Sequence, residues 1–165
     1  MKDDGFTLKG KGAKDQGQFI RLSDMKELYV RDDSVVFVTF SKEKYTLTQF
    51  GGMYDEFVVD FYKMRNAFLS RALFMEQGEL KFEYDGKYEY MNQYNKPMHK
   101  GRACIRIYDE GIVVLPQTKD AFVSPFNFLQ MHEFDELEYN LKCALDNGST
   151  IFFHQLGSVY DQFQE

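Results

Sequence analysis

Apolar and polar residues alternate in short runs over the first 50 residues of the chain, and a period of two residues is typical of β-strands. Polar breaks at residues 31–33 and 41–44 separate the runs, which predicts antiparallel strands joined by tight turns. The predicted strands are residues 19–22, 27–30, 34–40 and 45–50. Residues 1–17 contain four glycines around one short apolar alternation, and they predict a frayed start or the last strand of something missing.

The period changes to about three and a half residues after Gly51 and Gly52, which predicts one long amphipathic helix over residues 53–75. Gly52 can stand at the N-cap, with Asp55 facing the positive end of the helix dipole. We expect the helix to bury the face that carries Phe57, Phe61, Met64 and Phe68.

A second series of β-type runs follows the break at Gln77 and Gly78. The predicted strands are residues 79–84, 87–93, 102–108, 112–115, 122–131, 137–145 and 150–155. The pairs at residues 85–86, 110–111 and 147–148 are turn residues that tolerate a positive φ. Seven strands and the beginning of a helix predict a small barrel or sandwich closed by a C-terminal helix.

Residues 154–163 repeat residues 48–57 at a distance of 106 residues (154 − 48 = 106). Five of the ten positions are identical, namely Gln, Gly, Tyr, Asp and Phe. Upstream, the same distance without gaps pairs apolar residues with apolar residues, such as Leu28 with Phe134. A repeated strand-to-helix corner with matching upstream residues indicates an internal duplication.

The sequence therefore predicts an α+β fold, made mainly of antiparallel β-strands, with about one and a half tandem copies of a repeated unit. We call residues 1–77 the first unit, a partial copy that holds the last strands and the long helix. Residues 78–165 are the second unit, with seven strands and the start of the closing helix. The first strands of the first unit would have to precede Met1.

The second unit resembles the pleckstrin-homology-like (PH-like) superfold, in which seven antiparallel strands in two packed sheets are followed by one helix that plugs an open end. The resemblance rests on residues 86–163, chiefly on 106–116, 123–129 and the corner at 156–163. The sequence of these segments is similar to that of bacterial tandem PH-like proteins. Two features depart from the family: the chain has no Trp, although one is common in the closing helix of eukaryotic members, and the first unit is incomplete. The superfold hosts lipid, peptide and protein binding alike, so the resemblance implies binding without assigning a site.

The net charge argues against polyanionic partners. The chain of 165 residues has a formal charge of −6 and a pI near 5.1, so no global positive field exists to attract nucleic acid or anionic lipid. The N-terminus lacks an apolar signal core, and no run reaches the roughly 18 apolar residues of a membrane helix. We expect a cytoplasmic protein that binds no nucleic acid and has little contact with membranes.

The sequence lacks a clear catalytic or metal-binding constellation. His99, His132 and His154 have no partner at metal-ligand spacing. Cys104 and Cys143 lie in strand-like segments without a CxxC spacing, and we interpret them as buried reduced thiols rather than as a disulfide. No nucleophile elbow is present, and the glycines and lysines of residues 9–12 lack the spacing of a phosphate-binding loop. We therefore expect neither enzyme activity nor a cofactor.

One basic cluster lies at residues 96–102, in the predicted loop between the second and third strands of the second unit. The candidate contacts for an anion such as a phosphate head group are Lys96, His99, Lys100 and Arg102. A solvated loop explains the same residues, and we favour that interpretation. The cluster supports peripheral binding of anionic lipid as an alternative function.

Tyrosines alternate along the predicted hairpin that precedes this cluster. A period of two residues places four of them on one face, namely Tyr84, Tyr88, Tyr90 and Tyr94. This face is either the edge of a core, which we favour, or an interface, where tyrosine is enriched.

These observations together predict a non-catalytic binding or scaffolding module that acts through protein contacts. The strands within residues 18–50 lack the neighbours that a complete unit would supply, and an exposed strand edge can pair with another chain. We favour a homodimer through this sheet edge, with docking against the second unit as the alternative.

Overall fold

The computed structural model describes residues 5–10 and 17–163. The elements of the first unit are β1 Gly5–Leu8, β2 Gln18–Arg21, β3 Met25–Arg31, β4 Ser34–Thr39, β5 Lys44–Leu47 and α1 Tyr54–Ala72. The strands of the second unit are β6 Leu80–Met91, β7 Pro97–Tyr108, β8 Gly111–Pro116, β9 Phe122–Pro125, β10 Leu129–Asp135, β11 Asn140–Leu145 and β12 Thr150–His154. Short 3₁₀ turns are η1 Leu22–Asp24, η2 Gly51–Met53, η3 Phe126–Phe128, η4 Gly157–Val159 and η5 Asp161–Phe163.

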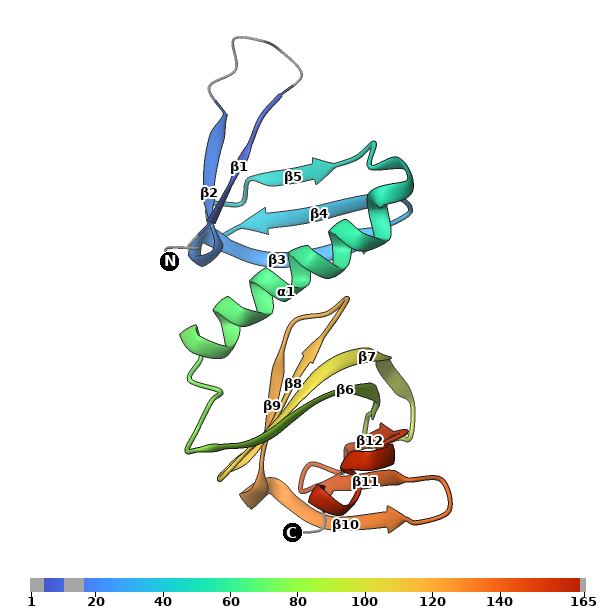
Figure 1. Ribbon diagram of the computed structural model, residues 1–165. Helices are drawn as coiled ribbons and strands as arrows, with labels where there is room; N and C mark the ends of the chain where they lie inside the picture. The colour runs from blue at the N-terminus through green and yellow to red at the C-terminus, as the bar shows by residue number, and fades with distance from the viewer. Residues whose placement is uncertain (1–4, 11–16, 164–165) are drawn as a thin grey trace.

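The first unit consists of the hairpin β1–β2, the antiparallel sheet β3–β4–β5 and the helix α1, which lies along that sheet (Figure 1). Alternation along the strands and the apolar face of the helix bring their large side chains together in one core. The buried members are Ile20, Leu22, Met25, Leu28, Val35, Phe37, Val58, Phe61 and Tyr62. Phe57, Met64 and Phe68 pack on this core but stay partly exposed, so the predicted face of the helix is confirmed.

The second unit is one antiparallel sheet of seven strands in the order β10-β11-β12-β6-β7-β8-β9. The prediction of a mainly antiparallel β fold with one long helix is thus confirmed. β9 and β10 are the two edges of this sheet, so it does not close into a barrel. Its core contains buried apolar residues from β7, β8, β11 and β12, including Ile105, Val114, Cys143, Ile151 and Phe153.

Several predicted strand boundaries in the second unit are wrong, including that of the strand expected from residue 102, which begins at Pro97. Residues 79–93 were expected to form a hairpin with its turn at residues 85–86, but Leu80–Met91 form one continuous strand, β6. Asp85 and Gly86 lie within it, opposite Cys104 and Ala103 of β7. Glycine is compatible with this place because the Tyr84 ring folds over it, 2.4 Å from where a Cβ would stand. The run expected over 122–131 is instead broken by η3 into β9 and β10, and the strand expected from 137 begins at Asn140.

The N-terminal predictions need two corrections. Residues 5–8 form a strand that pairs with β2, so the frayed start expected over residues 1–17 does not describe them, while residues 1–4 and 11–16 lie outside the described residues. The helix begins at Tyr54, after the turn η2, and ends at Ala72 rather than at 75. Its N-cap is Met53, which makes no side-chain capping bond, so Gly52 does not take that role.

Helix α1 also lies between the two units (Figure 1). Buried Arg65 donates from Nε and Nη2 to the two carboxylate oxygens of Asp120, in the β8–β9 turn, at 2.6 and 2.9 Å. The next residue, Asn66, donates to the carbonyls of Pro116 and Lys119 and accepts from the amide of Ala121. One turn of the helix thereby fixes the β8–β9 turn. A small apolar cluster extends the contact; its members are Leu69, Met75, Tyr108, Val113, Leu115 and Ala121.

The two units run through the same order of elements from β1 to η2 and from β8 to η4. From β2 and β9 up to the β3–β4 turn the spacing is 104 residues, as for η1 and η3 (126 − 22 = 104). After it the spacing is 106 residues, as for β4 and β11 (140 − 34 = 106). The cause is the turn itself, which has two residues between β3 and β4 and four, residues 136–139, between β10 and β11. The ungapped pairing expected upstream, such as Leu28 with Phe134, is therefore wrong by two residues.

The repeated sequence corner has a physical explanation in its backbone. Gln49 and Gln155 have φ of 67° and 60°, and Gly51 and Gly157 have φ of 58° and 52°. Two left-handed residues separated by one position turn the chain sharply from β5 into η2, and from β12 into η4. Glycine adopts this conformation at no steric cost. The shared Gln and Gly of the motif thus stand at the two positions with the most demanding geometry.

Candidate functional site

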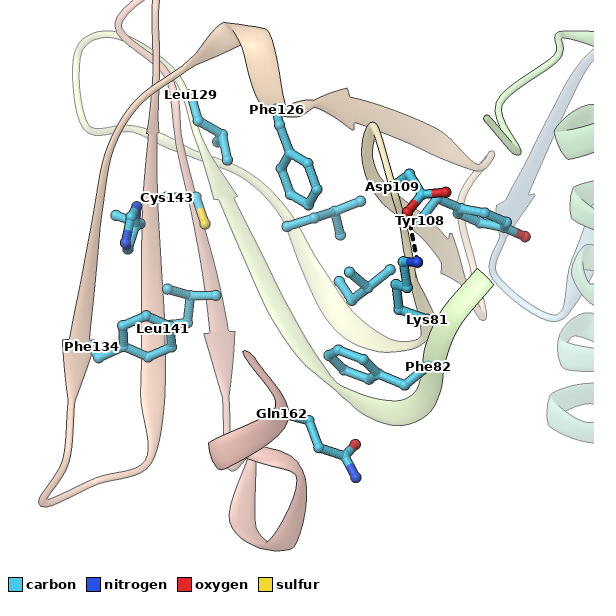
Figure 2. A pocket seen from close by; sticks show the side chains of 13 residues that line it. Lys81, Phe82, Tyr108, Asp109, Phe126, Leu129, Phe134, Leu141, Cys143 and Gln162 are labelled. Carbon is cyan, nitrogen blue, oxygen red and sulfur yellow. Dashed lines mark ion pairs between the residues drawn. The ribbon is translucent and has the colours of Figure 1, made fainter. Parts of the chain in front are cut away.

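A cavity lies in the second unit (Figure 2). It has a volume of about 890 Å³ and lies between β6–β8 on one side and β10–β11 on the other. Most of its lining is apolar, and the principal apolar residues are Phe82, Ile107, Ile112, Phe126, Leu129, Phe134 and Leu141. Figure 2 shows Phe126 and Leu129 at one end of this cavity, with Phe134 and Leu141 across from Phe82.

Polar groups stand at the rim of this cavity. The Lys81 ammonium lies 2.8 Å from the Asp109 carboxylate. This carboxylate also accepts a hydrogen bond from the backbone amide of Glu79 at 2.6 Å. The hydrogen bond with Lys81 lowers the pKa of Asp109, and the same bond raises the pKa of Lys81. Gln162, from the C-terminal turn η5, also lines the cavity and lies below Phe82 in Figure 2. The site thus presents an apolar floor with a few charged and amide groups around its opening.

The cavity residues of η3, β10 and β11 hold positions that correspond to helix-covered positions of the first unit. Phe126 begins η3 as Leu22 begins η1, and Leu129 begins β10 as Met25 begins β3. His132 lies opposite Cys143 in the ladder β10–β11, as Leu28 lies opposite Phe37 in β3–β4. Similarly, the pair Phe134 and Leu141 takes the place of the pair Val30 and Val35.

The exposure of these matched positions differs between the units. Leu22, Met25 and Leu28 are 1%, 3% and 8% exposed, because α1 lies over them. The matched Phe126 is 39% exposed, Leu129 is partly exposed and His132 is exposed. The described chain after η4 continues only through η5, to Phe163. The cavity therefore lies where a helix sits in the first unit.

Two polar side chains of α1 form hydrogen bonds with the backbone of β3. The Tyr62 hydroxyl donates to the Leu28 carbonyl at 3.0 Å, and burial raises the pKa of this phenol. Arg65 Nη1 donates to the Met25 carbonyl at 3.1 Å. The strand β3 thus offers carbonyl acceptors to the helix beside its apolar contacts. In the second unit, the carbonyls of Leu129 and His132 in β10 correspond to those of Met25 and Leu28.

The four basic candidates at residues 96–102 do not form a loop. Only Lys96 precedes β7, whereas His99, Lys100 and Arg102 lie within that strand. Because side chains alternate along a strand, His99 lies on the opposite face from Lys100 and Arg102. The His99 ring stacks on Tyr90 and its Nδ1 lies 3.0 Å from the Tyr88 hydroxyl. Burial and the charge of Lys119 lower the pKa of His99. The structure therefore does not bring the four side chains together on one face.

The four candidate tyrosines separate into two groups. Tyr88 is buried in the core of the second unit, and Tyr84 and Tyr90 pack against that core from the same strand. Tyr94 lies in the turn after β6 and is 80% exposed. Three of the four thus belong to the core, and Tyr94 stands apart from them.

Both cysteines are free, in agreement with the interpretation as reduced thiols. Cys143 is buried in the cavity wall and Cys104 is partly buried on β7. Burial raises the pKa of the two thiols to about 12 and about 11, with the charge of Glu83 contributing at Cys104. Within the described residues, no group of three or more His, Cys, Asp or Glu side chains is placed to hold a metal ion. No helix of the described chain is long and apolar enough to cross a membrane.

Sequence reasoning missed the cavity residues because they read as ordinary strand residues. The available signal was the sequence motif shared by residues 48–57 and 154–163. The motifs at residues 48–57 and 154–163 predict the same strand-to-helix corner. The residues that such a helix would cover could have been identified by matching β10 and β11 to β3 and β4. The sequence matches no protein-family model, and no curated protein matches it significantly.

Proposed function

We propose that the protein is a non-catalytic binding module that acts through protein contacts, and that its second unit receives an amphipathic helix of a partner in the cavity beside β10 and β11. One observation carries this proposal: Phe126, Leu129 and His132 are open at positions where Leu22, Met25 and Leu28 are covered by α1. An apolar groove of this kind suits recognition of the apolar face of a helix.

The proposal includes two copies of one PH-like unit, the first partial and the second more complete. The shared order of elements and the paired left-handed Gln and Gly residues support the duplication. The close approach of Gly5 to the backbone of β2 and of Gly111 to that of β9 supports it as well. The order of the seven strands and the turn that follows them support the PH-like assignment, because the resemblance implies seven antiparallel strands and then a helix.

The contact residues of α1 indicate which residues the partner helix should carry. Val58, Phe61 and Tyr62 supply the apolar contacts at helical spacing, and Arg65 follows one turn later. We expect a partner helix with two or three apolar or aromatic residues on one face. A tyrosine or arginine on that face would reach the carbonyls of Leu129 and His132.

A synthetic peptide with the sequence of residues 51–75 is the probe that tests this function. Fluorescence anisotropy with the full chain should show saturable binding. The variant Phe126→Ser should weaken that binding by about tenfold, because it removes an aromatic anchor from the cavity. The matched control is Phe128→Ser: Phe128 is 47% exposed, lies two residues away and does not line the cavity. Equal binding by the two variants would contradict the proposal.

A further inference from the structure

A second opening lies in the first unit, between β1 and β5. It is an apolar groove of about 560 Å³ with Asp60 as its one charged lining residue among the described residues. Its apolar lining includes Phe6, Leu8, Leu47, Phe50, Phe57 and Met64. This groove is separate from the cavity of the second unit, because none of its lining residues comes from β6 to β12.

The two strands that border this groove each have one unpaired edge. Within the described residues, β1 pairs only with β2, and β5 pairs only with β4. The strands at the matching places in the second unit are β8 and β12. β8 pairs with β7 and β12 pairs with β6, so two strands fill the space that is open in the first unit. The groove of the first unit therefore corresponds in position to the strands β6 and β7 of the second unit.

The backbone of β5 points hydrogen-bonding groups toward this opening. The Thr39 amide donates to the Glu43 carbonyl at 2.9 Å, and that pair continues the ladder in which Phe37 faces Tyr45 and Val36 faces Thr46. Bonded and non-bonded pairs alternate in an antiparallel ladder. The amides of Lys44 and Thr46 therefore point away from β4. At the place matching Thr46 in the second unit, Phe152 faces Glu89 of β6.

We propose that this groove receives a β-hairpin of a partner protein, with one strand paired to β5 and the other to β1. The second unit shows what fits between such strands, because its β6–β7 hairpin occupies the matching place. The hairpin strands carry apolar residues at alternate positions, which face the groove, and a lysine or arginine opposite Asp60. Main-chain bonds to the strand edges supply affinity, and alternate side chains supply specificity.

The test uses a phage-displayed library of hairpins built on residues 80–108, with the alternating positions randomised, selected against the full chain. Selected hairpins are then titrated against the wild type, Thr46→Pro and Thr46→Val. Proline removes the outward amide of Thr46 without removing a bond to β4, as edge strands allow. Binding to Thr46→Pro should be weaker by about tenfold or more, because the amide bond and its neighbours are lost, while Thr46→Val should bind as the wild type does.

A thermal melt of Thr46→Pro shows that the variant is folded before binding is compared. Amide hydrogen exchange supplies a second readout, since a bound hairpin should slow exchange at Lys44 and Thr46. The proposal is overturned if no hairpin is enriched, or if Thr46→Pro binds the selected hairpins as well as the wild type does. It is also overturned if sedimentation shows a dimer that Thr46→Pro dissociates, because a second copy of the chain would then occupy this edge.

Discussion

Arg65 and Asp120 form a two-pronged ion pair that joins the helix of the first unit to the β8–β9 turn of the second. The guanidinium is 2% exposed and also donates to the carbonyls of Met25 and Lys26. A planar guanidinium suits this role, because its donors reach a carboxylate and two carbonyls at once. One side chain thus connects α1, β3 and the β8–β9 turn.

Removal of the Asp120 carboxylate should destabilise the folded chain. Asp120→Ala leaves a buried guanidinium without its anion. We expect the free energy of unfolding to fall by about 1–3 kcal/mol, less than for a fully buried pair because the Asp120 side chain is 43% exposed. The exposed Asp85→Ala is the control and should change that free energy by less than about 0.5 kcal/mol. Urea denaturation measures both. Equal midpoints for Asp120→Ala and the wild type would show that this pair is not important for stability.

The core of the first unit depends on Phe61. This side chain is 6% exposed and packs edge-on against Phe6 and Phe37. Phe61→Ala should lower the free energy of unfolding by about 3–5 kcal/mol, since it leaves a cavity beneath α1. Phe40→Ala, at a phenylalanine that is 68% exposed, should have little effect. If the two variants unfold at the same denaturant concentration, α1 does not bury this face.

Alanine substitutions at two neighbouring glycines test the geometry of the strand-to-helix corner. Gly51 has φ of 58°, where a side chain is strained, whereas Gly52 is outside the left-handed region and has open space around its Cβ position. Gly51→Ala should cost about 1–2 kcal/mol of stability, and Gly52→Ala should be nearly neutral. Thermal melts of the two variants give the comparison. The reverse order of stability would contradict this account of the motif.

Much of the fold was predictable because its signals are local. The alternation of apolar residues predicted β3, β4 and β5, and the change of period at Gly51 predicted α1. The continuous strand β6 was not predictable in this way, because Asp85 and Gly86 have the sequence of a hairpin turn and are held in a strand by pairing with β7. Similarly, the buried place of Arg65 depends on Asp120, which is 55 residues away.

The candidate site could not be predicted from the sequence, because it also depends on contacts that form only in the folded chain. Basic residues at 96–102 and tyrosines at 84–94 drew attention because of their residue type, yet His99 and Tyr88 contact each other inside the sheet. The cavity is defined by the exposure of ordinary apolar residues such as Phe126. That exposure depends on which segments pack over Phe126, which is a property of the folded chain.

The stability of the second unit should depend on pH through His99. Burial and Lys119 lower the pKa of His99 below the ordinary value of 6.5, so the unfolded chain takes up a proton at a higher pH than the folded chain does. Stability should therefore fall as the pH drops below about 6.5 toward the folded pKa. Urea midpoints measured from pH 7 downward should fall less steeply in His99→Phe. Identical slopes in the two proteins would contradict this assignment.

Because the chain contains no Trp, binding of a helix in the cavity of the second unit can be measured directly by fluorescence. A single tryptophan is introduced by Phe126→Trp, or by Phe128→Trp as the control outside the cavity, and the peptide of residues 51–75 is added to each. We predict a saturable blue shift of the emission of Phe126→Trp, because the helix removes the indole from water, and no shift for Phe128→Trp. An unchanged emission from Phe126→Trp at high peptide concentration, or the same shift in both variants, would contradict the claim.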